Sequence, residues 1–289
     1  MKIYIIGHKG WIGNMYINLF IKNNIEYITS NYRGESDEIK NDILDKKPTH
    51  ILCCMGRTHG TYNDIVYNTI DYLELKDTLV ENINDNLYVP LTIALFAKDH
   101  NIHFTYMGTG CIFSYPDSNN IDNKFTELSK PNFFGSNYSI VKGFTDMLMK
   151  QTNALILRIR MPITRNNHPR NFITKILNYK KICSMPNSMS VLDDLLPVSI
   201  QMMQNNETGC YNFTNPGYIT HNMILTMYRD IIDNSFTWDN FTIEEQSNIL
   251  LSKRSNNILD TKKLEDKYNV INIVDSIKNC MYNFTSSPI

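Results

Sequence analysis

Three glycines spaced three residues apart follow the first apolar run of the chain and open a helical pattern. The apolar run is Ile3-Tyr4-Ile5-Ile6, the glycines are Gly7, Gly10 and Gly13, and the helical pattern extends from residue 12 to 20. Glycines at this spacing allow a tight strand-to-helix turn and a close approach of the backbone to a pyrophosphate, which the N–H groups of the helix N-terminus can bind. Tight turns also use glycine for steric reasons alone, but the position between strand and helix predicts a dinucleotide site.

Further apolar runs alternate with helical patterns along the chain. Strands are predicted at residues 26–30, 50–54, 103–107 and 154–160, and a helical pattern covers residues 69–97. This alternation predicts an α/β fold with a Rossmann-type, doubly wound parallel sheet. We place the cofactor-binding domain at residues 1–160 and a smaller C-terminal substrate lobe, interleaved with the first domain, at residues 161–289. Within the lobe we expect helices at residues 171–177 and after a cap at Thr220.

Charge and cysteine content exclude several classes of protein. The 289 residues carry a net charge of -1 and a pI of about 6.6, which argues against a nucleic-acid or anionic-membrane partner. The six cysteines lack metal-site spacing, so we expect reduced thiols and no metal. The chain begins directly with a strand pattern and has no apolar run long enough to span a bilayer. A soluble, intracellular, cytoplasmic protein is expected.

The residues after the second strand bear on the choice of cofactor. An acidic residue there would bind the ribose 2′-hydroxyl of NAD, but the sequence has Asn31-Tyr32-Arg33. A guanidinium suits a 2′-phosphate, so NADP(H) is favoured over NAD(H). The alternative is that Arg33 is a solvated turn residue. After the third strand, Met55-Gly56 is where the backbone could pass along the cofactor.

The fourth strand ends in Gly108-Thr109-Gly110-Cys111. Ligands of open parallel sheets bind outside the carboxyl ends of the strands, so Thr109 and Cys111 fall where chemistry is expected. If the chain remains extended there, the hydroxyl and the thiol share a face, because residues two apart in a strand point to the same side. The alternative for Cys111 is a small, buried apolar role.

Tyr138 and Lys142 are four residues apart in a helical pattern. Side chains at this spacing lie on one face, where an ammonium can stabilise a phenolate and lower the tyrosine pKa from about 10 toward neutrality. Such a tyrosine can give its proton to a carbonyl oxygen as hydride reaches the carbon. Taken alone, Tyr-x-x-x-Lys occurs by chance, and an exposed i,i+4 pair is its more common meaning. Together with the glycine loop and Thr109 it predicts a reductase.

These features resemble the cofactor loop and the catalytic threonine, tyrosine and lysine of the extended short-chain dehydrogenase/reductases. Longer strings resemble one branch, the nucleotide-rhamnose synthases, which are UDP-4-keto-6-deoxyglucose 3,5-epimerase/4-reductases, and the resemblance covers nearly the whole chain. The strings are Lys47-Pro48-Thr49-His50, Gly108 to Phe113, Lys130 to Phe133, Arg158 to Ile163, Pro169 to Lys175, Pro186 to Met189, Asn212 to Gly217 and Arg254 to Asn257.

The resemblance implies a bifunctional enzyme that converts UDP-4-keto-6-deoxy-D-glucose to UDP-L-rhamnose with NADPH. Cys111 and Lys175 resemble the pair that epimerises C3 and C5, with either residue as base or acid, and Thr109, Tyr138 and Lys142 resemble the reductase set. Cofactor contacts are implied for Gly7, Gly10, Trp11, Ile12, Gly13, Arg33, Asp42, Ile43, Cys54, Met55, Tyr138, Lys142 and Met161. Substrate contacts are implied for Thr58, Thr109, Asn171, Asn187 and Arg254. Without the resemblance, Lys175 and Arg254 would be read as surface cations.

Two loops depart from the family pattern. The loop after the third strand reads Cys53-Cys54-Met55-Gly56 where the family usually has Asn-Ala-Ala-Gly, so a side-chain amide is missing. Downstream, Arg57-Thr58-His59-Gly60 retains only the threonine of the sugar-facing segment.

Three other functions were considered. A monofunctional 4-reductase of the dTDP-4-dehydrorhamnose type would not need Cys111, and the preference for UDP over dTDP rests on the resemblance. A dehydratase or 4-epimerase with bound NAD⁺ is disfavoured, because such dehydratases place Asp-Glu after the threonine. A redox-sensing binding protein would be expected to lack the tyrosine or the lysine, and both are present. A homodimer through helices flanking the sheet is also expected.

Overall fold

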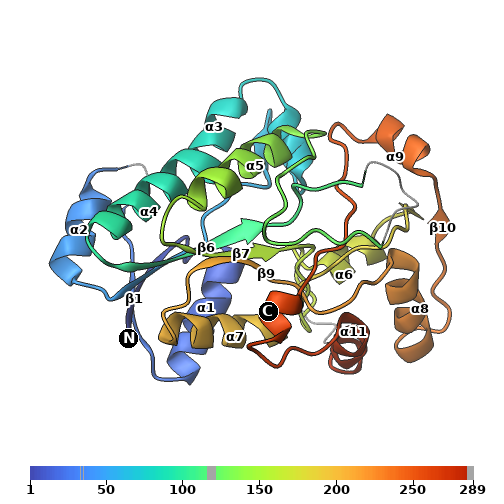
Figure 1. The fold of residues 1–289 in the computed structure, drawn as a ribbon. Coiled ribbons are helices and arrows are strands. Elements are labelled where there is room, and N and C mark those ends of the chain that lie inside the picture. Colours follow the sequence, from blue (N-terminus) through green and yellow to red (C-terminus); the bar gives the residue numbers. More distant parts are fainter. Residues whose placement is uncertain (33, 35, 116–121, 285–289) are drawn as a thin grey trace.

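A six-stranded parallel sheet forms the centre of the molecule (Figure 1). The computed structural model describes residues 1–32, 34, 36–115 and 122–284. The strand order is β2-β1-β3-β6-β7-β9, and every neighbouring pair is parallel. The strands are β1 (Lys2–Ile6), β2 (Glu26–Thr29), β3 (His50–Cys53), β6 (His103–Thr109), β7 (Leu155–Ile159) and β9 (Gly209–Asn212). The α/β fold with a doubly wound parallel sheet is therefore confirmed.

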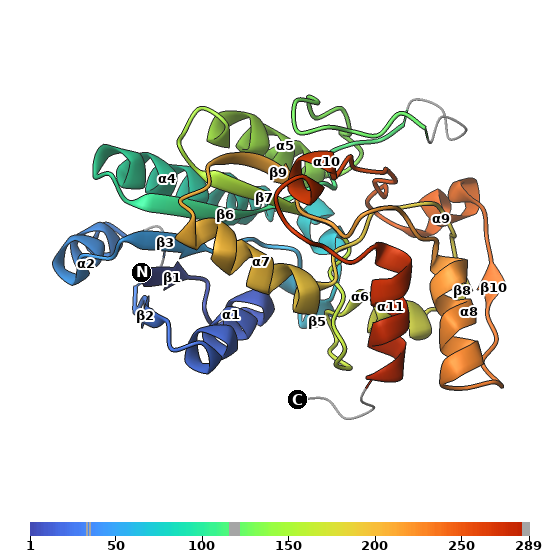
Figure 2. The same cartoon turned by 60° about the horizontal axis from the view of Figure 1, so that its bottom comes forward.

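Helices cover both faces of the sheet because its strands are apolar on both sides. Ile3, Ile5 and Leu157 pack on one face against α1 (Trp11–Lys22) and α7 (Leu192–Gln204). Tyr4 and Ile156 pack on the other face, together with side chains of α2 (Glu38–Lys46) and α4 (Val89–Asp99). Figures 1 and 2 show α4 and α5 (Asn137–Met149) on the side of the sheet opposite α1 and α7.

The periodicity of segment 69–97 predicted one helix, but the structure divides this segment into four elements. It contains a 3₁₀ turn, η1 (Ile70–Glu74), then α3 (Leu79–Ile83), a π-helical turn, η2 (Asn84–Tyr88), and α4. Pro90 lacks the N–H that would bond the carbonyl of Asn86. The Thr145 hydroxyl of α5 donates to that carbonyl instead, at 2.7 Å. A tertiary hydrogen bond thus satisfies the backbone carbonyl that the irregular turn leaves without a partner in its own helix.

The C-terminal part of the chain both returns to the sheet and builds a core of its own. β9 pairs with β7, and α7 packs on the sheet, so part of the predicted lobe belongs to the sheet and the boundary at residue 160 stays a prediction. The remaining elements are α6 (Phe172–Leu177), α8 (His221–Ile231), α9 (Ile243–Ile249), α10 (Lys262–Glu265), α11 (Ile273–Tyr282) and the short parallel pair β8 (Lys181–Ile182) and β10 (Asp239–Asn240).

The second core lies between α6, α8 and α11, which Figure 2 shows at one end of the molecule. Ile173, Ile224 and Ile277 are fully buried in it. Thr220 caps α8 as predicted, because its hydroxyl accepts from the N–H of Met223 at 3.1 Å. A small hairpin, β4 (Gly60–Tyr62) with β5 (Ile65–Tyr67), precedes η1. No helix in the part of the chain that the structure describes is both long and apolar enough to cross a bilayer.

A buried ion pair fastens α5 to the sheet. Arg158 of β7 is fully buried, and its Nε and Nη2 donate to the two carboxylate oxygens of Asp146 at 2.8 and 2.7 Å. The same guanidinium donates to the side-chain carbonyl of Asn212 in β9 at 3.3 Å. Bidentate geometry of this kind fixes the relative position of two elements. It therefore holds the helix that carries Tyr138 and Lys142.

Asp146→Ala should destabilise the protein strongly. Removing the carboxylate leaves a buried, unpaired guanidinium, and breaking such a pair costs about 3–5 kcal/mol. We expect a lower free energy of unfolding in denaturant titrations. The matched control is Asp266→Ala, which removes an exposed carboxylate from its pair with Lys262 and should leave stability unchanged. Equal effects of the two substitutions would show that the buried pair has no special role.

Candidate active site

The glycine loop between β1 and α1 leaves no room for side chains. Gly7 has a φ of +81°, and a Cβ on Gly13 would lie 2.3 Å from the carbonyl oxygen of Gly7. Gly10 is the N-cap of α1, and no side chain caps the helix. The N–H groups of the first turn are therefore available to an anion, as phosphate binding at a helix N-terminus requires.

The loop after β3 lies directly against this glycine loop. A Cβ on Gly7 would come within 3.0 Å of the backbone at Cys54 and Met55. On the other side, the Trp11 ring stacks on His168 with a centroid distance of 5.0 Å and an angle of 4° between the planes. β1, β3 and β6 all end at this edge, where parallel sheets bind their ligands. The residues present fit a dinucleotide cofactor.

The other residues with implied cofactor contacts lie in different environments. Asp42 accepts a hydrogen bond from the Tyr4 hydroxyl at 2.6 Å, and Ile43 is fully buried in the core under α2. Met161 has a φ of 40° and packs against the second core. Arg33 lies outside the described residues. Their cofactor contacts stay predictions.

Thr109, Cys111 and Tyr138 lie together at the carboxyl end of β6. The Thr109 hydroxyl accepts from the N–H of Cys111 at 3.0 Å, and both Thr109 and Cys111 lie close enough to Tyr138 to affect the pKa of its phenol. The strand ends at Thr109, so the chain is turned, rather than extended, where Cys111 follows. This turn brings the backbone N–H of Cys111 to the Thr109 hydroxyl.

The start of α5 is fixed to the same turn. Ser136 is the N-cap and accepts from the N–H of Ser139 at 3.1 Å, and the Ser139 hydroxyl donates to the carbonyl of Cys111 at 2.8 Å. Tyr138 lies between these two serines. Its ring is thus held beside Cys111 by the capping interaction itself.

The expected lowering of the Tyr138 pKa by Lys142 is wrong in this structure. Burial raises the pKa of Tyr138, an effect that a Cys111 thiolate increases and the bond to Thr109 opposes. Lys142 donates instead to the hydroxyl of Tyr106 on β6, and burial lowers the pKa of Lys142 to about 8. Desolvation of the phenol therefore sets the direction of the Tyr138 pKa shift.

Lys175 approaches from α6. Its ammonium donates to the backbone carbonyl of Asn68 at 3.3 Å. Burial lowers the pKa of Lys175, and the positive charges of Arg170 and Arg254 lower it further. Arg170 in turn donates to the ring of His59, at 3.1 Å from Nη1 to Nδ1. Lys175 therefore lies among cations, in surroundings that favour its neutral form.

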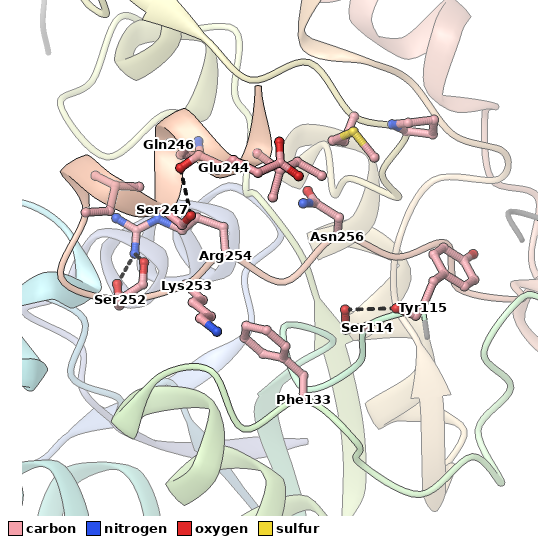
Figure 3. A pocket seen from close by; sticks show the side chains of 14 residues that line it. Ser114, Tyr115, Phe133, Glu244, Gln246, Ser247, Ser252, Lys253, Arg254 and Asn256 are labelled. Carbon is pink, nitrogen blue, oxygen red and sulfur yellow. Dashed lines mark hydrogen bonds between the residues drawn. The ribbon is translucent and has the colours of Figure 1, made fainter. Parts of the chain in front are cut away.

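Arg254 lines a pocket of about 350 Å³ beneath α9 (Figure 3). Its Nη2 donates to a carboxylate oxygen of Asp71 at 2.6 Å, and its Nη1 donates to Ser252. Phe133 and Tyr115 contribute aromatic rings to the same pocket. Cys111 and Tyr138 are not among the described residues that line it, so the pocket adjoins rather than contains the group around Thr109.

The chain is similar to known proteins both in sequence and in fold. No protein-family model matches the chain. Protein L780 of Acanthamoeba polyphaga mimivirus is 49% identical over 272 residues, which are 93% of each chain. The crystal structure of the mimivirus L780 UDP-rhamnose synthase matches with a TM-score of 0.94 and 47% identity, over 98% of this chain and 99% of that one. An Arabidopsis thaliana bifunctional dTDP-4-dehydrorhamnose 3,5-epimerase/dTDP-4-dehydrorhamnose reductase is 41% identical over 98% of this chain and 92% of its own.

The chain belongs to this 3,5-epimerase/4-reductase family of rhamnose synthases. The dTDP-4-dehydrorhamnose reductase of Bacillus anthracis, solved with NADP, shares the fold, with a TM-score of 0.77 at 14% identity over 98% of this chain and 99% of that one. Family membership and the glycine loop together make the chain an NAD(P)H-dependent enzyme of nucleotide-sugar metabolism.

Two of the residues with implied substrate contacts, Asn171 and Asn187, use their side-chain amides for hydrogen bonds within the protein. The Asn171 amide caps α6 and donates to the carbonyls of Thr164 and Asn166 at 2.8 and 2.7 Å. The Asn187 amide accepts from Arg160 at 2.5 Å and donates to Asn256 at 2.9 Å. Both are fully buried. Their substrate contacts stay predictions, as does that of Thr58, whose hydroxyl lies 3.4 Å from the His59 ring.

Two residues around the family site had no role in the sequence reading. Arg160 is buried and donates to the carbonyl of Gly110, between Thr109 and Cys111, at 2.8 Å. Asp71 holds Arg254. The sequence carried no signal for either residue, because the burial of Arg160 and the contact of Asp71 with the distant Arg254 are visible only in the fold.

Gly13→Ala should abolish cofactor binding in this family member. The added methyl would meet the carbonyl of Gly7 at 2.3 Å, which forces the loop away from the geometry that receives a phosphate. Titration with NADPH, followed by calorimetry, measures the loss. Asn14→Ala, at the next and exposed position of α1, should bind normally. Unchanged affinity of the Gly13 variant would mean that the cofactor does not contact this loop.

Lys142→Met should change stability in a way that depends on pH. The folded chain releases the Lys142 proton near pH 8 instead of the ordinary 10.5, so between these values the unfolded state binds more protons and stability rises with pH. The stability of the variant relative to the unmodified chain should therefore be greater at pH 7 than at pH 10, as denaturant unfolding can measure. Exposed Lys22, changed to Met, should show no such trend. A pH-independent difference for Lys142 would rule out its desolvation.

Proposed function

We propose that this chain is a bifunctional 3,5-epimerase/4-reductase that converts UDP-4-keto-6-deoxy-D-glucose to UDP-L-rhamnose with NADPH. The observation that carries the proposal is the group formed by Thr109, Cys111 and Tyr138, in which a thiol adjoins the hydroxyls of a reductase. The name of the Arabidopsis relative supports both activities, and the name of the mimivirus relative supports the UDP-linked sugar.

The epimerase activity follows from the chemistry of a 4-keto sugar. The ketone acidifies the hydrogens at C3 and C5, so inversion needs one group to remove a proton and another to return it on the opposite face. We assign these roles to Cys111 and Lys175. Tyr138 and Thr109 are proposed to hold the carbonyl oxygen, where negative charge develops. The lowered pKa of Lys175 makes its ammonium a readier proton donor.

The reduction uses the same oxygen. When bound, NADPH supplies hydride to C4. Tyr138 then donates its proton to the oxygen, and the raised pKa of its buried phenol keeps that proton in place until it is needed. Lys142 sits one helical turn away and orders the polar groups beneath the phenol through its bond to Tyr106.

The preference for NADPH rests on Arg33, whose guanidinium would bind the 2′-phosphate. We also propose a homodimer through the helices flanking the sheet. Supporting it is a set of exposed apolar side chains on α3, α4 and α5, namely Leu79, Val80, Leu95, Phe144 and Leu148. Burial of such side chains is the main favourable term in association.

Isotope labelling tests the two activities separately. The protein, UDP-4-keto-6-deoxyglucose and NADPH incubated in deuterated water should give UDP-L-rhamnose with deuterium at C3 and C5, identified by NMR. Cys111→Ala should remove the label and the product, because one proton-transfer group is lost, and Tyr138→Phe should remove the reduced product. Cys183→Ala, at a buried position in the second lobe, is the control.

Three results would contradict the proposal. Reduced product without deuterium at C3 and C5 would show that the protein has no epimerase activity. Normal turnover by Cys111→Ala would show the same. Either result would favour the monofunctional dTDP-4-dehydrorhamnose-type reductase. Unchanged reduction by Tyr138→Phe would show that the proton donor is wrong. Running the assay with UDP- and dTDP-linked ketosugars in parallel compares kcat/KM for the two nucleotides.

A further inference from the structure

The segment just before and within η1 contacts two of the proposed functional cations. The carbonyl of Asn68 accepts from the Lys175 ammonium at 3.3 Å. Three residues later, the Asp71 carboxylate accepts from Arg254 at 2.6 Å. One short stretch of the N-terminal part thus contacts one cation from α6 and another from the segment after α9.

Asp71 is a buried carboxylate whose oxygens are almost fully used. One oxygen accepts from the N–H and the hydroxyl of Ser252 at 2.9 and 2.6 Å. The other accepts from the Thr69 hydroxyl and from Arg254, both at 2.6 Å. These bonds overcome the effect of burial and lower the pKa of Asp71 to about 2. It is therefore ionised throughout the working range of pH.

The bonds to Asp71 and Ser252 hold the Arg254 guanidinium at one side of the pocket. Figure 3 shows Arg254 and Ser252 side by side at the edge of the pocket beneath α9. A guanidinium has five N–H donors in a rigid fork, and Asp71 and Ser252 take donors from its two terminal nitrogens. The donors that remain can meet an anion in a fixed direction, with less side-chain entropy lost on binding.

We propose that Asp71 is a positioning residue for the nucleotide-sugar substrate, which acts by orienting Arg254 toward the diphosphate. The inference rests on the proposed function, in which Arg254 contacts that group. Two effects of the carboxylate oppose each other: it repels a nearby anion, and it orders the cation that binds it. Because the Asp71 charge is compensated by four hydrogen bonds, we infer that ordering outweighs repulsion.

Binding of UDP, which has the diphosphate but no sugar, tests this inference. Asp71→Asn keeps the size of the side chain and removes the charge, and it should weaken UDP binding roughly tenfold or more, since a charge-assisted hydrogen bond is lost. Uridine, which lacks the diphosphate, should bind as before. In turnover the KM for the nucleotide sugar should rise while kcat is retained. Asp77→Asn, the same change at an exposed position of the same segment, is the matched control.

A double-mutant cycle with Arg254→Gln separates the possible outcomes. If Asp71 acts through Arg254, Asp71→Asn should have no further effect on UDP affinity when Arg254 is already glutamine. Weaker UDP binding by Arg254→Gln with unchanged or tighter binding by Asp71→Asn would overturn the inference alone. Unchanged binding by Arg254→Gln would overturn the assignment of Arg254 as well. If Asp71→Asn does not fold, Ser252→Ala can replace it, because this change removes the hydroxyl that bonds both Asp71 and Arg254. Ser252→Ala should also weaken UDP binding. Unchanged UDP binding by this variant would overturn the inference.

Discussion

The guanidinium of Arg160 joins the sheet, the turn at Gly110 and the C-terminal segments at one buried point. It donates to the carbonyls of Gly110, Ser188 and Ser255 and to the side chain of Asn187, at 2.5 to 3.2 Å. Burying a cation among neutral acceptors is costly unless every donor is satisfied, and burial accordingly lowers the Arg160 pKa. The position of Gly110, and with it the turn that brings Cys111 to Thr109, depends on this network.

The strands were predictable because strands of a parallel sheet that is buried on both faces appear in the sequence as short, nearly continuous apolar runs. β1, β3, β6 and β7 agree with the sequence within two residues at either end. β9 was missed, because Gly209-Cys210-Tyr211-Asn212 is too short and mixed to stand out, and only its pairing with β7 makes it a strand. The break in 69–97 was missed for a related reason: the partner of the freed carbonyl at Asn86 is Thr145, on another helix.

Within the site, local spacing predicted the grouping but not the electrostatics. The motif Tyr138-x-x-x-Lys142 places both residues on α5, yet the four-residue spacing does not reveal that the ammonium reaches Tyr106 on β6. Nor does it show that burial of the phenol raises the pKa of Tyr138. The roles of Asp71 and Arg160 were out of reach because their partners lie more than a hundred residues away or act through backbone carbonyls, which have no sequence signature.

The late strand β9 has a consequence for the chain as a folding unit. It covers the outer edge of β7, so a polypeptide ending near residue 160 would present the unpaired backbone of an apolar strand to solvent. Synthesis must therefore pass residue 212 before β9 can pair with β7, and until then the edge of β7 is exposed to association with other strands. The part of the chain before residue 160 and the strand β9 therefore build one sheet, and a cut between them would expose β7.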